Sequence, residues 1–188
     1  MWPENAEVTA RLFNVYARTN QLEKAMAIAE SEVEREPDNA QHWYNYGSLL
    51  LEAERYDDAI MALEKSIEIE PDNISGLFNL GAAYQNKGVD LNDEVSTLDE
   101  EIRGGELSEE DAAAAQEKME ATAAQRDDLF GKSLEPLTKA RSMAEATGED
   151  VTGICTALGQ AYARTNDMEK ASEAYECAEG TTPDAEGN

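Results

Sequence analysis

The chain has 188 residues, of which 41 are acidic and 15 are lysine or arginine, so its formal net charge is −26 at pH 7. This charge argues against a nucleic acid or an anionic membrane surface as the partner, because both would be repelled. No apolar run approaches the length of about 18 residues that a membrane-spanning helix needs, and the sole histidine, His42, disfavours Ser-His-Asp chemistry and His-rich metal sites.

A period of 34 residues runs through the sequence. Pro37 and Pro71 are 34 residues apart, and both are followed by Asp-Asn. The string Tyr-Ala-Arg-Thr-Asn occurs at 16–20 and again at 162–166. In the copy that begins at Ala40, the large or apolar side chains are Trp43, Tyr46, Leu50 and Leu63, and the small ones are Gly47, Ala59 and Ser66. This spacing resembles the tetratricopeptide repeat, a helix–turn–helix unit of about 34 residues.

The resemblance implies an all-α solenoid of four helix pairs, of the tetratricopeptide-repeat type, in one array over 1–188. The first two pairs are predicted over about 6–39 and 40–73. The positions that hold Trp43 and Gly47 in the second pair hold Thr9 and Phe13 in the first. The first pair is therefore an imperfect copy. The proline near the end of each pair stops its second helix, since proline lacks an amide hydrogen and restricts the residue before it.

Small residues are expected to bring the two helices of a pair close together. These residues are Gly47 with Ala59 in the second pair and Gly159 with Ala171 in the fourth. One pair cannot bury its own apolar face, so neighbouring pairs must stack.

The third pair is predicted over about 74–148 and departs from the period. Its first helix begins near Ile74, but Phe130, the counterpart of Tyr56, lies 130 − 56 = 74 residues further on, which exceeds one period of 34 by 40 residues. We therefore place an insertion at about 89–129, between the two helices of this pair.

The insertion is predicted to be a helical hairpin that lengthens its two host helices. One apolar stripe steps by four, three and four residues through Leu91, Val95, Leu98 and Ile102. Gly104-Gly105 breaks the chain, and Ser108 is a predicted N-cap of the returning helix. The returning stripe, with Arg126 as its polar exception, is Ala112, Ala115, Met119, Thr122 and Leu129. A floppy acidic loop is the alternative, because Gly88 lies where a normal first helix would stop and could kink it.

Acidic residues in the insertion also invite a calcium interpretation. The residues spaced like the ligands of an EF-hand loop are Asp90, Asn92, Glu94, Ser96 and Glu101. That loop needs glycine at its sixth position, where this chain has Val95. A solvated helix face explains these residues better, so we expect no metal, no cofactor and no catalytic residue.

The fourth pair is predicted over about 152–185, with Pro183 near its end. It holds both cysteines of the chain, Cys155 and Cys177. Neither has a catalytic partner in the sequence, so we expect two unpaired, partly buried thiols. A disulfide between the two helices stays open as an alternative, but the spacing alone does not support it.

The resemblance implies a ligand groove on the concave face, lined by the first helix of each pair. The candidate binding residues are Asn14, Arg18, Tyr44, Ser48, Leu51, Phe78, Ala82, Gln85, Asn86, Gln160 and Arg164. Tyr44 and Phe78 offer aromatic anchors, the amides can bond a peptide backbone, and the arginines suit acidic parts of a partner. Alternatively, the aromatic side chains only pack against each other. Relatives that clamp a chaperone's C-terminal carboxylate carry lysine where this chain has Ala10, so that ligand is not expected.

The sequence therefore predicts a non-enzymatic interaction module or scaffold that binds a peptide or protein segment in its groove, without membrane insertion. Two alternatives remain. The hairpin could serve a structural or assembly role, pairing with another chain or making a homo-oligomer, or the chain could be the accessory domain of a larger enzyme. The abrupt start and the lack of a solvating C-terminal helix predict an excised segment, and the compartment stays open between cytoplasm and bacterial periplasm or cell envelope.

Overall fold

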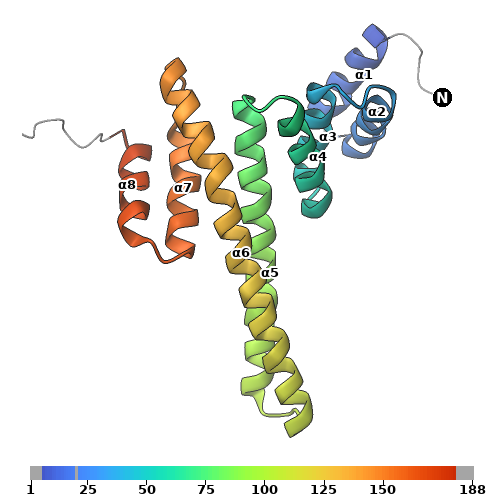
Figure 1. The fold of residues 1–188 in the computed structure, drawn as a ribbon. Helices are drawn as coiled ribbons and strands as arrows, with labels where there is room; N and C mark the ends of the chain where they lie inside the picture. Colours follow the sequence, from blue (N-terminus) through green and yellow to red (C-terminus); the bar gives the residue numbers. More distant parts are fainter. Residues whose placement is uncertain (1–5, 20, 181–188) are drawn as a thin grey trace, which may run out of the picture. The chain divides into compact units, whose positions relative to one another are not determined.

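The computed structural model describes residues 6–19 and 21–180 (Figure 1). Within these residues the chain forms eight helices and no strand, which confirms the predicted all-α class. The helices are α1 (Ala6–Arg18), α2 (Leu22–Arg35), α3 (Ala40–Glu52), α4 (Tyr56–Ile69), α5 (Ile74–Gly104), α6 (Glu109–Thr147), α7 (Thr152–Arg164) and α8 (Met168–Ala178). Pro183, the predicted end of the fourth pair, lies outside the described residues.

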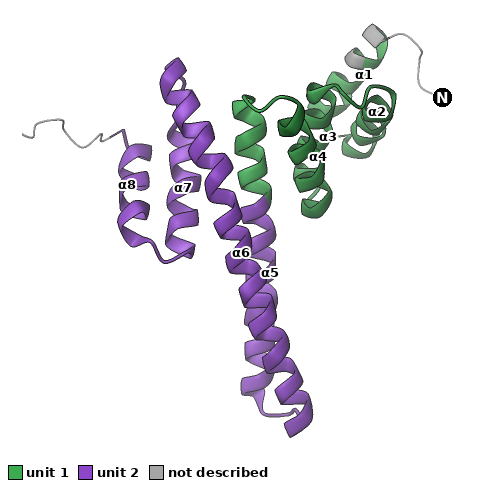
Figure 2. Cartoon of the chain, viewed as in Figure 1, with its two compact units in different colours: residues 1–83 green, residues 84–188 purple. Residues whose placement is uncertain are grey.

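The chain divides into two compact units (Figure 2). Unit 1 covers 1–83 and contains α1 to α4 with the first part of α5. Unit 2 covers 84–188 and contains the rest of α5 with α6, α7 and α8. Each unit is described below by itself.

Close approach of α3 and α4 in unit 1 depends on Gly47. A Cβ atom at Gly47 would lie 2.7 Å from Cγ of Leu63, well inside van der Waals contact. The predicted close approach is therefore present, and the atoms nearest to the glycine belong to Leu63. One turn further along α4, the hydroxyl of Ser66 donates to the carbonyl oxygen of Ala40 (2.9 Å), which satisfies a buried polar group where the two helices meet.

The turn between α3 and α4 and the turn between α7 and α8 have the same backbone conformation. Glu54 and Asn166 both have positive φ, 59° and 61°. The amide of the residue after each bonds back to a carbonyl five residues earlier, Arg55 to Leu50 and Asp167 to Tyr162, both at 2.9 Å. This pattern is the Schellman end of a helix, which places one residue in the left-handed region.

Two long helices run side by side in unit 2 (Figure 1). α5 continues through Gly88 without a break, and a Cβ atom at Gly88 would lie 3.0 Å from Cζ of Phe130 in α6. The glycine that threatened a kink thus makes room for an aromatic ring. α6 also continues through Pro136, which lies within the predicted second helix of the third pair.

Polar contacts join α5 and α6 along the segment 89–129. The guanidinium of Arg126, the exception in the predicted stripe, donates to Oδ1 of Asn92 (3.2 Å). Further out, Lys118 pairs with Glu94 at 2.7 Å. Ser108 caps α6 as predicted, because its side chain accepts from the amide of Asp111. The interpretation of this hairpin as an insertion within a third repeat stays a prediction.

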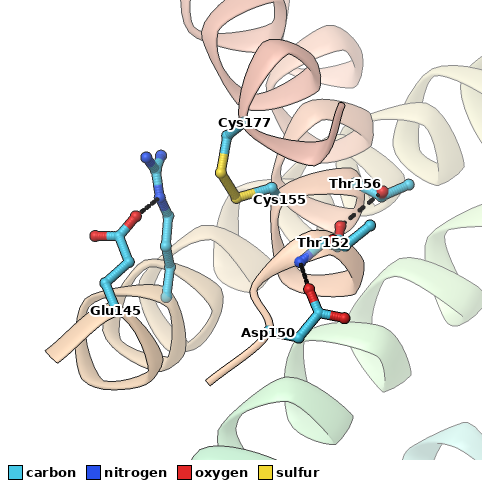
Figure 3. Close-up of a disulfide and its surroundings, with 7 residues drawn as sticks. Glu145, Asp150, Thr152, Cys155, Thr156 and Cys177 are labelled. Atoms are coloured by element: carbon cyan, nitrogen blue, oxygen red, sulfur yellow. Dashed lines mark hydrogen bonds and ion pairs between the residues drawn. A yellow bond between two sulfur atoms is a disulfide. The ribbon is translucent and has the colours of Figure 1, made fainter. Parts of the chain in front are cut away.

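The two cysteines are joined in a disulfide, with their Cα atoms 5.9 Å apart (Figure 3). The expectation of unpaired thiols was therefore wrong. Cys155 is buried on α7, and Cys177 lies near the end of α8. Spacing could not show this, because it does not say how closely α8 approaches α7. The two helices lie close together at Gly159, where an added Cβ would lie 2.5 Å from the ring of Tyr175.

Candidate protein-interaction site

The predicted groove residues fall on the first helix of each pair, and both units carry some of them. In unit 1 they are Asn14 and Arg18 on α1, Tyr44, Ser48 and Leu51 on α3, and Phe78 and Ala82 on α5. In unit 2 they are Gln85 and Asn86 on α5, with Gln160 and Arg164 on α7.

The aromatic anchors of unit 1 are half-buried. Tyr44 on α3 and Phe78 on α5 each keep part of the ring accessible to solvent. Ser48, between them in the predicted groove, donates to the carbonyl of Tyr44 (2.8 Å) and accepts from the side-chain amide of Asn79 (2.9 Å). Ser48 and Asn79 therefore tie α3 to α5, and the sequence analysis had not singled out Asn79.

Two predicted groove residues of unit 2 already contact other helices of the protein. Gln85 is only 7% exposed, and its side-chain amide donates to the backbone carbonyl of Ala157 on α7 (2.8 Å). The guanidinium of Arg164 lies 5.2 Å from the ring centre of Phe130. These two side chains hold helices of unit 2 together, whereas Asn86 and Gln160 are exposed as expected.

A cavity of about 370 Å³ lies among α1, α2 and α3 in unit 1. Its lining residues are Thr9, Phe13, Asn14, Ile28, Ala29, Glu32, Gln41, His42 and Asn45. Thr9 occupies the position that Trp43 holds in the second pair, where the indole N–H donates to the carbonyl of Pro37 (2.7 Å). The sequence marks the first pair as the imperfect copy at this residue, but it does not show that a cavity lies beside it.

The cavity combines an apolar floor with a polar rim. Phe13, Ile28 and Ala29 supply apolar surface, and the side-chain amide of Gln41 donates to Oδ1 of Asn45 (2.8 Å) at the rim. The rim amides retain further donor and acceptor capacity, since each amide group has two N–H donors and an oxygen with two lone pairs.

Glu32 contributes a carboxylate side chain to the cavity wall, and this side chain is 15% exposed. Arg35 contacts one of its oxygens at 2.8 Å, and Nε2 of His42 contacts the other at 3.2 Å. Nδ1 of His42 is buried without a hydrogen-bond partner, 3.9 Å from a carboxylate oxygen of Glu36. Hydrogen bonds from Asn39 and Arg35 lower the pKa of Glu36 below its ordinary value, so Glu36 adds negative charge beside this wall.

Comparison with known proteins identifies repeats in both units. A family model described as "TPR repeat" matches residues 47–88, and two described as "Tetratricopeptide repeat" match 30–61 and 152–183. No curated protein matches the sequence significantly. Among the described helices, none contains a stretch long and apolar enough to cross a bilayer.

Several solved structures share the fold at low sequence identity. MamA MSR-1 is 18% identical, with a TM-score of 0.64 over 94% of this chain and 76% of that one. A mutant of MamA is 17% identical, with a TM-score of 0.63 over 95% and 78%. The TPR2B domain of yeast Sti1, in its pHsp70 complex, is 15% identical, with a TM-score of 0.52 over 86% and 96%. At these identities the likeness shows the fold alone.

Proposed function

Because this chain is a tetratricopeptide-repeat protein with the predicted all-α solenoid fold, we propose that it is a non-catalytic module that binds a segment of another protein. The observation that carries the proposal is the pair of half-buried aromatic side chains, Tyr44 and Phe78, at equivalent positions of α3 and α5 in unit 1. Half-exposed aromatic rings on rigid helices are the residues that anchor partners in protein interfaces. One structure of the same fold, the yeast Sti1 domain, is itself a complex with pHsp70.

The proposed groove is narrower than the sequence predicted. In unit 1 we retain Asn14, Arg18, Tyr44, Leu51, Phe78 and Ala82 as groove residues, with Ser48 as the bridge to Asn79. In unit 2, Gln85 and Arg164 already make contacts within the protein, so only Asn86 and Gln160 remain candidates.

We assign the hairpin a spacer role within a third repeat over about 74–148. Its stripe residues Leu98, Thr122 and Leu129 are buried, so this part of the stripe packs inside the molecule. The charged residues of 89–129 are mostly exposed, and two copies of so acidic a surface would repel each other. These observations favour binding through the groove over self-association through the hairpin.

The disulfide favours an oxidising compartment. Disulfides persist in secreted and periplasmic proteins and are rare where glutathione and thioredoxin keep thiols reduced. Cys155 and Cys177 are the two cysteines of the whole chain, and they are paired with each other. We therefore favour an exported location over the cytoplasm.

A peptide-display selection on the immobilised full chain tests the proposed groove. We expect the wild-type chain to enrich a family of peptides, and the Tyr44→Ala, Phe78→Ala double variant to lose them, since a central aromatic anchor contributes about 2 kcal/mol. Met61→Ala is the matched control, because Met61 is a large exposed apolar residue on α4 and not on a groove helix. Equal enrichment by the double variant and the wild type would move the binding site away from Tyr44 and Phe78.

A further inference from the structure

We propose that the cavity among α1, α2 and α3 is a specificity pocket for a basic side chain, lysine or arginine, of the segment that unit 1 binds. The proposal rests on the proposed function and adds the chemical class of the partner. The cavity has about 370 Å³, within the size range of about 300–1,000 Å³ of binding pockets, and it can therefore accept a long side chain.

The lining matches the two parts of a basic side chain. Lysine and arginine have an apolar stem of three or four methylene groups and a charged head. Phe13, Ile28 and Ala29 provide apolar surface for the stem, and Glu32 provides a carboxylate for the head. No lysine or arginine is among the lining residues that the structure describes; the guanidinium of Arg35, which contacts one oxygen of Glu32, belongs to a residue outside that lining.

Glu32 can accept a further donor although it already has two partners. A carboxylate has about four acceptor sites on its two oxygens. Arg35 and His42 contact one oxygen each, so sites on both oxygens remain. Glu36, whose pKa is lowered and which stays ionised, adds a second negative charge close to His42.

Other classes of side chain fit this cavity less well. An acidic side chain would meet Glu32 at close range, and like charges repel strongly where water is partly excluded. An apolar side chain would pack against the apolar lining, but it would displace water from Glu32 without supplying hydrogen bonds in place of that water. The net charge of −26 acts in the same direction, since it attracts a cationic segment before contact.

The rim can hold the backbone of the same segment. Asn14 on α1 and Gln41 on α3 are exposed at the cavity, and Asn45 lies one turn beyond Gln41. Their amides can bond the peptide groups on either side of the inserted side chain. A segment held in this way places one residue in the pocket and its neighbours along α1 and α3.

The experiment uses a peptide selected by display on the full chain and measures its affinity by fluorescence anisotropy in 0.1 M sodium chloride. We expect the selected peptides to share one lysine or arginine. Replacing that residue with norleucine, which keeps the straight stem and removes the charge, should weaken binding about ten-fold or more. Replacement with glutamate should weaken binding further.

Two protein variants separate the pocket from general charge. Glu32→Gln should reduce the preference for the basic peptide over its norleucine analogue to about one. Glu34→Gln removes the same charge from an exposed position of α2 outside the cavity lining, and it should leave the preference unchanged. Thermal melts check that both variants fold. If Glu32→Gln unfolds, the two peptides compared on the wild-type chain still test the basic preference, and its reduction in Glu34→Gln would assign that preference to the overall charge.

The outcomes distinguish the pocket from the groove. Selected peptides that depend on Tyr44 and Phe78 but show no basic position would overturn the pocket and leave the proposed function standing. The preference for the basic peptide could also survive Glu32→Gln, or Glu34→Gln could reduce it equally. Either result would attribute the preference to the overall charge and would also overturn the pocket. A selection that enriches no peptide would overturn both proposals.

Discussion

Glu54 has a backbone conformation that few side chains tolerate. Its φ of 59° lies in the left-handed region, where the Cβ atom crowds the following carbonyl oxygen at a cost of roughly 1–2 kcal/mol. The equivalent turn residue of the last pair, Asn166, has nearly the same φ, and asparagine accepts this region more readily than glutamate.

We predict that Glu54→Asn raises the free energy of unfolding by about 0.5–1 kcal/mol, because it relieves this crowding. Urea denaturation followed by circular dichroism measures the change. The reverse exchange, Asn166→Glu, is the control and should destabilise the chain by a similar amount. A Glu54→Asn variant no more stable than the wild type would mean that this turn relaxes to another conformation.

Glycine-to-alanine substitutions should have opposite effects at different positions. We predict that Gly47→Ala lowers the free energy of unfolding by about 2–3 kcal/mol, because the new Cβ meets Leu63, which is 0% exposed and cannot move. Gly159→Ala should cost less, about 1–2 kcal/mol, because the ring it meets belongs to Tyr175, which is 39% exposed.

The matched control for these substitutions is Gly131→Ala in α6. No atom lies within 4 Å of a Cβ built there, so alanine should stabilise the helix by about 0.5–1 kcal/mol. Thermal or urea unfolding ranks the three variants. If Gly47→Ala lowers the free energy of unfolding no more than Gly131→Ala does, α3 and α4 can separate more easily than their packing indicates.

Residue types predicted close packing, but not the contacts that each side chain makes. Gly47 and Gly159 were expected to allow close helices, and they do. The side chains nearest to them, Leu63 and Tyr175, could not be predicted from spacing, because side chains lean along the helix. Gln85 has the polar character of a groove residue, and only the position of α7 shows that its amide bonds to Ala157.

The start of α8 depends on one charged cap. The carboxylate of Asp167 accepts from the backbone amide of Lys170 (3.3 Å) and from its ammonium group (2.7 Å). The hydrogen bond from the Lys170 side chain, followed by that from its backbone, lowers the pKa of Asp167 below its ordinary value of 3.8. A lowered pKa means that the folded chain binds this proton less tightly than the unfolded chain.

The stabilisation from Asp167 is therefore complete above pH 3.8 and is lost as the pH falls below it through the pKa of the folded state. We predict that Asp167→Asn, which keeps a capping oxygen but removes the charge, lowers the melting temperature at pH 7. The difference from the wild type should vanish towards pH 2. Melts of Glu169→Gln, in the same turn, provide the control. A difference that persists unchanged at low pH would assign the effect to packing and not to charge.

The long hairpin of α5 and α6 can be tested by removal. Deleting residues 90–129 removes 40 residues, restores a period of 34 between Tyr56 and Phe130, and leaves Gly88 at the turn position that Glu54 and Asn166 hold in the other pairs. We predict that the remaining 188 − 40 = 148 residues stay helical and unfold in one cooperative transition, because each helix pair contacts mainly its neighbours.

Circular dichroism and a thermal melt measure the outcome of this deletion. A deletion of 90–128, one residue shorter, is the control, since it moves Phe130 out of register and should unfold at a lower temperature. Loss of cooperative unfolding in the 90–129 deletion would show that the hairpin belongs to the core of unit 2.

Periodicity was sufficient to place the elements. The stripes through Leu98 and Leu129 indicated two helices, and α5 and α6 cover both. The sequence could not show why Gly88 does not interrupt α5, since the reason is the ring of Phe130 on another helix. The sequence also could not explain why Arg126 interrupts the apolar stripe, since its partner Asn92 lies 34 residues away along the chain.

The charge of the whole chain should make its stability depend on salt. Even if each of the 15 basic side chains paired with one carboxylate, 41 − 15 = 26 carboxylates would remain. Like charges at helical spacing destabilise a helix by about 0.2–0.5 kcal/mol per pair at low salt. Salt shortens the screening length from about 10 Å at 0.1 M to about 3 Å at 1 M.

We predict that the melting temperature rises between 0.05 M and 1 M sodium chloride, by about 2–4 °C for each kcal/mol of repulsion relieved. Melts in sucrose, which is excluded from the surface without screening charge, are the control. A midpoint that stays constant or falls in high salt would mean that ion pairs already offset the repulsion.

At the scale of the molecule, the sequence specified the repeat class but not the binding chemistry. The period and the spacing around Trp43 indicated helix pairs, since these features reflect packing common to all such repeats. The cavity depends on three helices that together place Glu32 and His42 at one wall. Local pattern cannot supply that arrangement.

The disulfide also affects how α8 opens locally. A helix can fray before the whole molecule unfolds, and proteases cut where fraying exposes the backbone. Cys177 ties α8 to the buried Cys155 of α7, so α8 cannot peel away alone. In the oxidised chain the amide hydrogens of α8 should therefore exchange with solvent about as slowly as those of α7. Reduction would let α8 open without α7, so the backbone of α8 would become accessible to proteases while α7 stays folded.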